Sequence, residues 1–380
     1  MQITNLSLLL GSRANHGWDR IWVTLFMVSV SLFIATSEAS GLKESNIIVK
    51  RIKTADGDIF DCVDIYKQPS LSHPLLKDHK VQIRPSMYSV EDSITTSRVL
   101  SEMGLNDGGC PEGSVPVAVD RLLQHNTSMK LANSFGIREY IAERRTSNGR
   151  YNGGAANLNV YSPPVGNGQV SSSRINVVNK YMNIQLQAGW MVNPVLFKDS
   201  KSRLFISSFE NGKLCINLNC GGFVQTNSKI FLGGVLSPVS RVSVNPQYYI
   251  EIYIHKDLKT GDWWVSMNSQ ANSIGYWPKA VVNYMNYATQ IQYGGYTSCY
   301  GKDTCPQMGN GLNPTTTRNA DACFISEVQY FDASSHIKPL KGNQQYPSTN
   351  KRRCYDVGTY LDLYGKLPKF SFGGNICSSD

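Results

Sequence analysis

The feature that most limits the fold of this chain is a dense succession of short strand-like runs after residue 150. Runs of Val, Ile, Tyr and Phe alternate there with Gly, Asn and Ser, as in Tyr248–Ile254 and Trp263–Met267. Helical periodicity is scarce, and the 32 Gly and 20 Tyr of the chain suit strands joined by tight turns. This pattern predicts an all-β, antiparallel sandwich or barrel over residues 151–380.

The first 39 residues have the pattern of a signal peptide. Arg13 and Arg20 precede an apolar run over residues 21–35, and Ser37-Glu38-Ala39 offers a small-residue cleavage site. The alternative is an uncleaved membrane anchor, but this run is shorter than the roughly 20 residues that a membrane-spanning helix needs. We therefore expect a secreted, extracellular protein with no stable membrane insertion after cleavage.

Secretion changes how the nine cysteines are interpreted, because most cysteines pair in an oxidising compartment. Their spacing suggests four pairs and leaves Cys323 over, although spacing alone does not fix the connectivity. The suggested pairs are Cys62/Cys110, Cys215/Cys220, Cys299/Cys305 and Cys354/Cys377.

The region before the β-rich part has a different organisation. Residues 40–130 contain two strand-like runs followed by a proline-rich stretch, which indicates a small separate domain. A glycosylation acceptor at Asn126 and the dibasic pair Arg144-Arg145 lie near its end. We interpret residues 131–150 as an exposed, cleavable connector.

Composition and motifs exclude several function classes. The net charge is +9, but the basic residues are scattered and no nucleic-acid-reading motif is present, which argues against nucleic acid as a partner. A basic secreted protein can instead adhere to acidic polysaccharide. The sequence has no Gly-x-Ser-x-Gly elbow and no His-Glu-x-x-His motif. We expect neither a cofactor nor a metal.

A series of motifs, in order and covering almost everything after the signal, resembles the neprosin family of plant glutamic peptidases. The resemblance implies a secreted zymogen, resident in the apoplast or cell wall. Residues 40–130 would form the activation-peptide domain, and residues 151–380 a β-sandwich peptidase that cleaves next to proline in acid. The motifs are Asp56–Pro69, His73–His79, Cys110–Pro116, Gly189–Pro194, Cys215–Gln225, Asp262–Trp264, Ile274–Pro278, Gln292–Gly295 and Phe372–Gly374.

The resemblance also locates the two catalytic positions of the family, and neither holds a carboxylate here. The family carries a glutamate just before Ala-Gly-Trp and another just after Gly-Gly, where this chain has Gln187 and Tyr296. The mechanism needs two carboxyl groups facing one water, one as base and one as acid. An amide takes up no proton, and a phenol with an ordinary pKa near 10 is a poor base in acid. We predict an inactive or severely impaired pseudopeptidase that retains a peptide-binding groove.

Two alternative functions remain open. The first is an active acid endopeptidase that uses a different carboxylate, for which Glu210 and Glu251 are the nearest glutamates in the core sequence. The second is a protein that binds proline-rich peptides or acidic wall polysaccharide by aromatic stacking, although aromatic residues also fill cores. Since successive strand residues face opposite sides, one of Trp263 and Trp264 would face the groove. The candidate groove residues are Trp190, Trp264, Tyr276 and Trp277.

Overall fold

The computed structural model describes residues 47–86, 103, 108–119, 129–130, 136–210, 212–314, 321–362 and 366–378. The contacts divide the chain into residues 1–48 and residues 49–380, and the second unit is the one described below. The predicted signal peptide over residues 1–39 and the glycosylation acceptor Asn126 lie outside the described residues.

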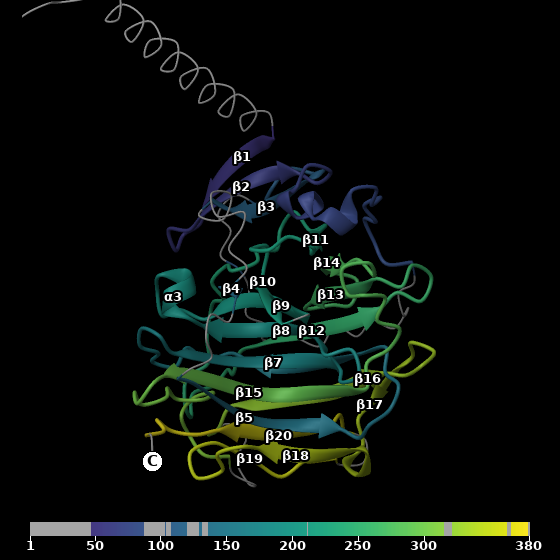
Figure 1. The fold of residues 1–380 in the computed structure, drawn as a ribbon. Coiled ribbons are helices and arrows are strands. Elements are labelled where there is room, and N and C mark those ends of the chain that lie inside the picture. Colours follow the sequence, from purple (N-terminus) through teal and green to yellow (C-terminus); the bar gives the residue numbers. More distant parts are fainter. Residues whose placement is uncertain are drawn as a thin grey trace, which may run out of the picture. The chain divides into compact units, whose positions relative to one another are not determined.

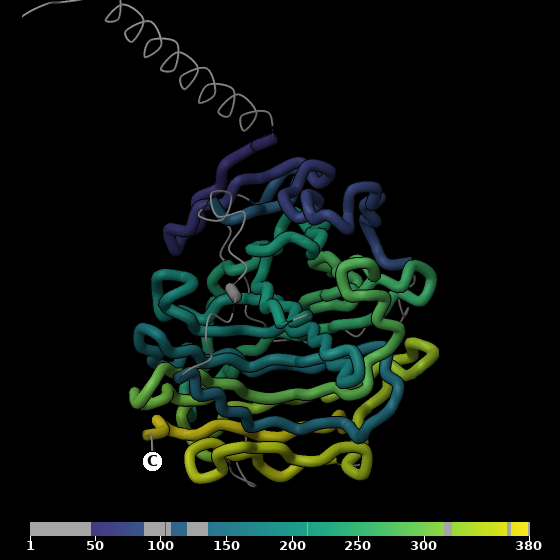
Figure 2. Tube along the Cα trace, in the orientation of Figure 1, coloured from purple at the N-terminus to yellow at the C-terminus, as the bar shows by residue number. Residues whose placement is uncertain are grey.

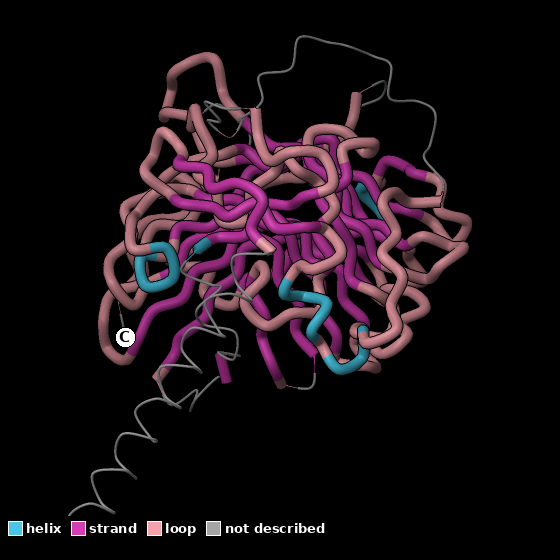
Figure 3. The backbone as a smooth tube through the Cα atoms, turned by 90° about the horizontal axis from the view of Figure 1, so that it is seen from above, coloured by secondary structure: helices cyan, strands magenta, loops and turns pink. Residues whose placement is uncertain are grey.

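The described chain is built from strands with only short helical turns between them, as Figure 3 shows by colour. The described residues include three 3-10 turns and one short α-helix: η1 (Pro69–Ser72), η2 (Pro74–Leu76), η3 (Gly342–Gln344) and α3 (Pro194–Phe197). The strands are β1 (Ile48–Lys53), β2 (Ile59–Asp64), β3 (Ser114–Ala118), β4 (Met129–Lys130), β5 (Ile137–Thr146), β6 (Gly153–Asn159), β7 (Val170–Asn179), β8 (Ile184–Val192), β9 (Arg203–Glu210), β10 (Lys213–Ile216), β11 (Val224–Gln225), β12 (Tyr249–Lys256), β13 (Trp263–Met267), β14 (Ser273–Trp277), β15 (Gln290–Tyr300), β16 (Phe324–Phe331), β17 (Ile337–Pro339), β18 (Gln345–Thr349), β19 (Asp356–Val357) and β20 (Lys369–Gly373).

Two large antiparallel sheets form the sandwich that the sequence predicted (Figure 1). The eight-stranded sheet has the order β18-β5-β15-β7-β8-β9-β10-β4. The nine-stranded sheet has the order β11-β14-β13-β12-β6-β16-β20-β19, with β17 paired to β16. Trp190 of β8 donates from Nε1 to the carbonyl oxygen of Asn159 in β6 at 2.9 Å and so joins the two sheets.

Alternation along the strands gives the eight-stranded sheet two different faces. In β8, the side chains of Ile184, Leu186 and Ala188 are buried in the core, whereas Gln185 and Gln187 are partly exposed on the other face. The same period of two in the neighbouring strands sends apolar residues into the sandwich and polar residues outward. This outward face carries the candidate site.

Residues 137–146 form an interior strand, so the connector predicted for residues 131–150 is wrong over this stretch. Strand β5 lies between β18 and β15. Figure 2 shows the C-terminal part of the chain, which contains β18, running beside it. Arg144 is only 8% exposed and donates to the carbonyl oxygen of Gly358. The dibasic pair is therefore not an accessible cleavage site. Its side chains alternate across a paired strand instead of extending into solvent.

Four disulfides are present among the described residues, and they are the pairs that the spacing suggested. Cys323 is free and buried, and burial raises the pKa of its thiol. Four disulfides are typical of proteins that fold in an oxidising compartment. The bonds are Cys62–Cys110 in the N-terminal sheet, Cys215–Cys220 after β10, Cys299–Cys305 after β15, and Cys354–Cys377 between the loop before β19 and the C-terminal segment.

The disulfide between Cys215 and Cys220 closes the turn that follows β10. Cys215 lies within β10, and Cys220 lies five residues later in the turn, with the two Cα atoms 5.6 Å apart. Both residues are partly exposed. Each of the other three disulfides contains at least one fully buried cysteine, namely Cys62, Cys305 or Cys377. This bond therefore fixes a surface turn at the edge of the sheet and contributes little to the core.

The N-terminal strands form a small sheet of their own, in the order β1-β2-β3, which contacts the sandwich through polar groups. The carboxylate of Asp58 pairs with Arg203 of β9 at 2.7 Å. The side chain of Gln68 donates to the carbonyl oxygen of Gln225 and accepts from its backbone N–H, both at 2.9 Å. These contacts attach the small sheet to both large sheets.

The segment that follows β2 covers one end of the nine-stranded sheet. Trp264 and Tyr276 are 0% exposed and stack with ring centroids 4.5 Å apart, under Leu76 and beside Val281. Tyr276 Oη lies 2.7 Å from His79 Nε2 and accepts from the backbone N–H of Gln82 at 2.9 Å.

The four aromatic residues predicted to line a groove are therefore buried, and that prediction is wrong. Trp190 lies between the sheets, and Trp277 packs edge-on against Phe223 with centroids 5.0 Å apart. Trp263 and Trp264 do face opposite sides of β13, but the N-terminal segment covers the second side too. Among the described residues, no helix has the length and apolar character to cross a membrane.

Replacing Tyr276 by Phe should loosen the segment that covers it. The substitution removes two hydrogen bonds, to His79 and Gln82, each worth about 1 kcal/mol, so opening should increase roughly 30-fold. Hydrogen–deuterium exchange over residues 79–86 measures this opening. Tyr181→Phe, at an exposed phenol, is the control. Equal exchange in both variants would contradict the attachment described here.

A buried histidine should make stability depend on pH. Both ring nitrogens of His255 in β12 lack a partner among the described residues, and burial lowers its pKa to about 4. Because His255 resists protonation in the folded state, the free energy of unfolding has its full value above the ordinary histidine pKa of about 6.5. The free energy of unfolding then declines as the pH falls toward about 4 and levels off below that, with a total loss of ~3 kcal/mol.

Denaturant unfolding of the wild type and of His255→Phe between about pH 7 and pH 4 tests this linkage. The variant should lose most of the decline, whereas His336→Phe, at an exposed position, should keep it. Burial also lowers the pKa values of His73 and His79, which act in the same direction, and raises that of Glu210, which acts in the opposite direction. Parallel profiles for all three proteins would contradict the role of His255.

Candidate active site

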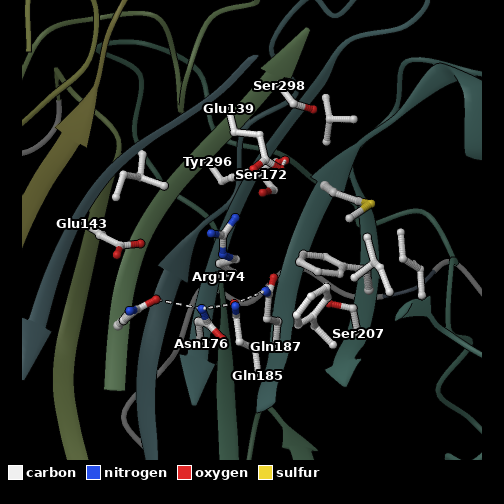
Figure 4. Close-up of a pocket in the computed structure, with 18 of the residues that line it drawn as sticks. Glu139, Glu143, Ser172, Arg174, Asn176, Gln185, Gln187, Ser207, Tyr296 and Ser298 are labelled. Carbon is white, nitrogen blue, oxygen red and sulfur yellow. Dashed lines mark hydrogen bonds between the residues drawn. The ribbon is translucent and has the colours of Figure 1, made fainter. Parts of the chain in front are cut away.

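A cleft of about 790 Å³ lies on the outward face of the eight-stranded sheet (Figure 4). Its lining comes from alternate residues of β5, β15, β7, β8, β9 and β10. One part of the lining is polar, and the other is apolar with side chains from β9 and β10. Lining residues used below are Glu139, Glu143, Arg145, Arg174, Asn176, Gln185, Gln187, Phe205, Phe209, Leu214, Ile216, Gln292 and Tyr296.

Gln187 and Tyr296, where the resemblance places the family glutamates, both line this cleft, but they are not neighbours. Gln187 is paired in register with Asn176, whereas Tyr296 is paired with Ser172 on the other side of β7. The two positions are thus two strands and four residues apart, roughly 16 Å between Cα atoms for ordinary strand geometry. Arg174 of β7 occupies the level between them, as Figure 4 shows.

Arg174 is the central cation of the cleft. Its register partners are Gly294 in β15 and Gly189 in β8, so no side chain flanks it on either neighbouring strand. The guanidinium lies over the ring of Tyr296, 4.4 Å from the centroid, and is only 8% exposed. Burial lowers its pKa, while the charge of Glu143 opposes that shift. Sequence reasoning missed this residue because nothing near it in the chain marks a motif.

Tyr296 is engaged by a carboxylate that the sequence did not single out. Its hydroxyl donates to Glu139 Oε1 of β5 at 2.6 Å. Burial raises the pKa of this phenol, and the nearby charge of Glu139 raises it further. Tyr296 is therefore a neutral donor in the cleft. It is not a base at any pH at which a glutamic peptidase would work.

A second unforeseen carboxylate, Glu143, lies on the same strand. It is 2% exposed and accepts from Nε of Arg145 at 2.6 Å. Both glutamates were missed because their strand was interpreted as a connector. The signal that identifies them is the period of two over residues 137–145, which places Glu139, Glu143 and Arg145 on one face.

Side-chain amides form a chain at the polar end of the cleft. Asn176 Nδ2 donates to Gln185 Oε1 at 3.0 Å and to Gln292 Oε1 at 2.8 Å. Gln187 makes one long hydrogen bond, from Nε2 to Gln185 Oε1 at 3.4 Å. Asn176 is 2% exposed, and its Oδ1 has no partner among the described residues.

The two glutamates considered from the sequence do not line the cleft. Glu251 lies on β12 in the other sheet, paired in register with Asn157. Glu210 ends β9, where burial raises its pKa, but it is not part of the cleft lining. Over the described ranges, no three His, Cys, Asp or Glu side chains gather in a way that could hold a metal ion.

The cysteines singled out from the sequence also lie outside the cleft lining. Leu214 and Ile216 of β10 line it, but Cys215 between them alternates to the other side of the strand, and its partner Cys220 lies beyond the end of β10. Cys354 and Cys377 are equally absent from the lining. These disulfides fix the polypeptide around the cleft and take no part in its chemistry.

The fold and the cleft define a β-sandwich protein with a polar groove on one sheet and an N-terminal sheet attached to it. Comparison with known families matches residues 167–375 to Neprosin and residues 51–150 to the Neprosin activation peptide. The chain therefore belongs to the Neprosin family, as the motifs indicated. Strand β5 lies within the part matched to the activation peptide, although it is an interior strand of the large sheet.

Solved structures similar to this one include two described as Scytalido-glutamic peptidase with transition-state analogues. They share 10% identity, with TM-scores of 0.30 and 0.28, over 62% of this chain and 99% of theirs. A third is SCP-B, described as a member of the Eqolisin family of peptidases in a complex with the tripeptide Ala-Ile-His. It shares 11% identity, with a TM-score of 0.24, over 62% of this chain and 99% of its own.

Asn176→Ala should destabilise the cleft sheet more than Gln187→Ala. The first removes a donor shared by two acceptors and should cost roughly 1–3 kcal/mol. The second removes one long hydrogen bond from a partly exposed side chain and should cost less than about 0.5 kcal/mol. Urea unfolding of both variants measures the difference. Equal losses would show that the amide chain is not centred on Asn176.

Proposed function

We propose that this protein is a secreted pseudopeptidase that binds peptides in the cleft without hydrolysing them. The supporting observation is that the described cleft lining has only two carboxyl groups, Glu139 and Glu143, and another side chain engages each of them. By the resemblance, Gln187 and Tyr296 hold the positions of the family glutamates, and neither can accept a proton from water in acid. The cleft itself is intact, with polar and apolar lining suited to an extended chain.

The two glutamates of β5 do not replace the lost pair. They are four residues apart on one strand, which places their Cα atoms roughly 13 Å apart. Carboxyl groups that share a water or a proton must lie within a few ångströms of each other. Each is also engaged already, Glu139 by the hydroxyl of Tyr296 and Glu143 by Arg145.

Secretion and maturation complete the proposal. The predicted signal and the four disulfides support an extracellular location. If the N-terminal domain is removed, the cut must fall before Ile137, because a later cut would remove β5 from the middle of the sheet. Removal would also uncover Trp264 and Tyr276.

One observation favours a second candidate, an acid endopeptidase that uses Glu139. This carboxylate lies 2.6 Å from the hydroxyl at the family position and is exposed to the cleft. An enzyme of this kind would pair Glu139 as base with an amide or phenol as donor. The polysaccharide-binding alternative has less support, because the aromatic residues proposed to stack on sugars are buried.

Hydrolysis assays separate the two candidates. The full chain, untreated and after acid treatment, is incubated with a proline-rich protein between about pH 2 and pH 6, and new peptide termini are detected by mass spectrometry. We expect no cleavage above that of heat-denatured protein. Turnover by the wild type that Glu139→Gln abolishes and Glu143→Gln preserves would contradict the pseudopeptidase proposal and assign the chemistry to Glu139.

A further inference from the structure

We infer that Arg174 is an anion receptor in the floor of the cleft, and that it binds one carboxylate of a peptide ligand. The inference rests on the proposed function, since the ligand must remain uncleaved, and it adds the recognition chemistry. It concerns a residue that no motif of the chain marks and that the hydrolytic mechanism does not require.

The first argument is the missing partner of a buried cation. Arg174 is 8% exposed, and its Nε has no hydrogen-bond partner among the described residues. Its guanidinium forms no salt bridge with a described carboxylate, and it lies against the face of the Tyr296 ring. The charges of Glu143 and Glu139 act on this cation from nearby, but their hydrogen bonds are made to Arg145 and Tyr296. A buried guanidinium with an unused donor is costly, so an anion that enters the cleft gains a hydrogen-bonding counter-charge.

The second argument is access. The register partners of Arg174 are Gly189 and Gly294, so the neighbouring strands place no side chain beside the guanidinium on the cleft face. Tyr296 covers one face of the guanidinium, which leaves its N–H edges for hydrogen bonding. A planar fork of N–H donors matches a carboxylate in two parallel hydrogen bonds.

The third argument limits the ligand to a single negative charge. The other charged residues of the lining are Arg145, already paired with Glu143, and Glu139, which accepts from Tyr296. The described lining thus carries two cations and two anions, and only Arg174 lacks a hydrogen-bonding partner. An acidic polysaccharide carries a carboxylate on successive sugars, and its further charges would meet Glu139 and Glu143.

The fourth argument favours a peptide as the carrier. Asn176 follows Arg174 by two residues on the same face, roughly 7 Å along the strand, and its Oδ1 needs a donor. A peptide extended along β7 can place a backbone N–H there while its carboxylate lies on Arg174. The apolar lining from β9 and β10, which includes Phe205, Phe209 and Ile216, can receive an apolar side chain.

Fluorescence anisotropy with the full chain tests the inference. The probe is a dye-labelled hexapeptide of alanine, proline and leucine, with a free C-terminal carboxylate or as the amide. A third probe is the amide with one interior glutamate, which distinguishes a terminal from a side-chain carboxylate. A carboxylate of either kind should raise affinity roughly 10- to 100-fold over the neutral amide. Equal binding of all three probes would overturn the inference.

Arg174→Met should abolish the preference for the carboxylate, while Arg241→Met, which removes an exposed charge outside the cleft, should keep it. The thermal midpoint of Arg174→Met should equal or exceed that of the wild type, because the variant buries no unpaired charge. Arg174→Lys, which keeps the charge but lacks the fork, should bind the carboxylate with intermediate affinity and serves if the Met variant does not fold. Wild-type affinity in the folded Met or Lys variant would overturn the inference.

Two further readouts keep the proposals separate. Tighter, Arg174-dependent binding of an oligogalacturonide than of the peptide would overturn the assignment to a peptide. The recovered probes are also analysed by mass spectrometry. Cleaved probe would contradict the proposed function, whereas intact probe bound without carboxylate preference would contradict only the role of Arg174.

Discussion

The alternation of side chains in one antiparallel sheet controls both the stability and the chemistry of this protein. Along the strands of the eight-stranded sheet that line the cleft, alternate residues face the core, and the residues between them face the cleft. The residues that follow the family positions, Ala188 and Thr297, are fully buried on the core side. A carboxylate lost at 187 or 296 therefore cannot be replaced by its neighbour in sequence. Only a residue on an adjacent strand can bring a carboxylate near these positions. Glu139 lies beside Tyr296 in this way, but the hydroxyl of Tyr296 already engages it.

The same constraint explains why glycines recur in the motifs around the cleft. A side chain at Gly294 would collide with Cβ of Glu143 and the carbonyl oxygen of Ala142. A side chain at Gly295, on the opposite face, would collide with the ring of Phe372 or the sulfur of Met308 in the core. The Gly-Gly pair thus permits close packing on both faces of β15. This packing role of the two glycines does not depend on which residue stands at position 296.

The sequence was sufficient for the fold class and for drawing attention to Gln187 and Tyr296, which line one cleft. Both depend on local signals, namely strand periodicity and motifs that surround a strand. It was not sufficient for the surroundings of these positions, because cross-strand partners such as Glu139 and Arg174 come from segments far apart in the chain. The strand over residues 137–146 was missed because its charged residues suggested an exposed segment. Arg144 and Glu143 are nevertheless buried, because a hydrogen bond and an ion pair satisfy their charged groups. Trp264 and Tyr276 were placed wrongly because their cover, residues 71–81, comes from a distant part of the chain. Trp190 and Trp277 pack within the sandwich itself.

The side chain at position 296 determines the electrostatic surroundings of Arg174. A glutamate at position 296 would project from the same backbone site as the ring that now covers the guanidinium 4.4 Å away. In that place a carboxylate would neutralise Arg174, and the cation would favour its ionised form. A tyrosine instead packs on the guanidinium, donates a hydrogen bond to Glu139 and supplies no charge. Tyr296 therefore places no negative charge on the guanidinium of Arg174. Under the two proposals made above, the same residue accounts for the absent acid and for the available cation.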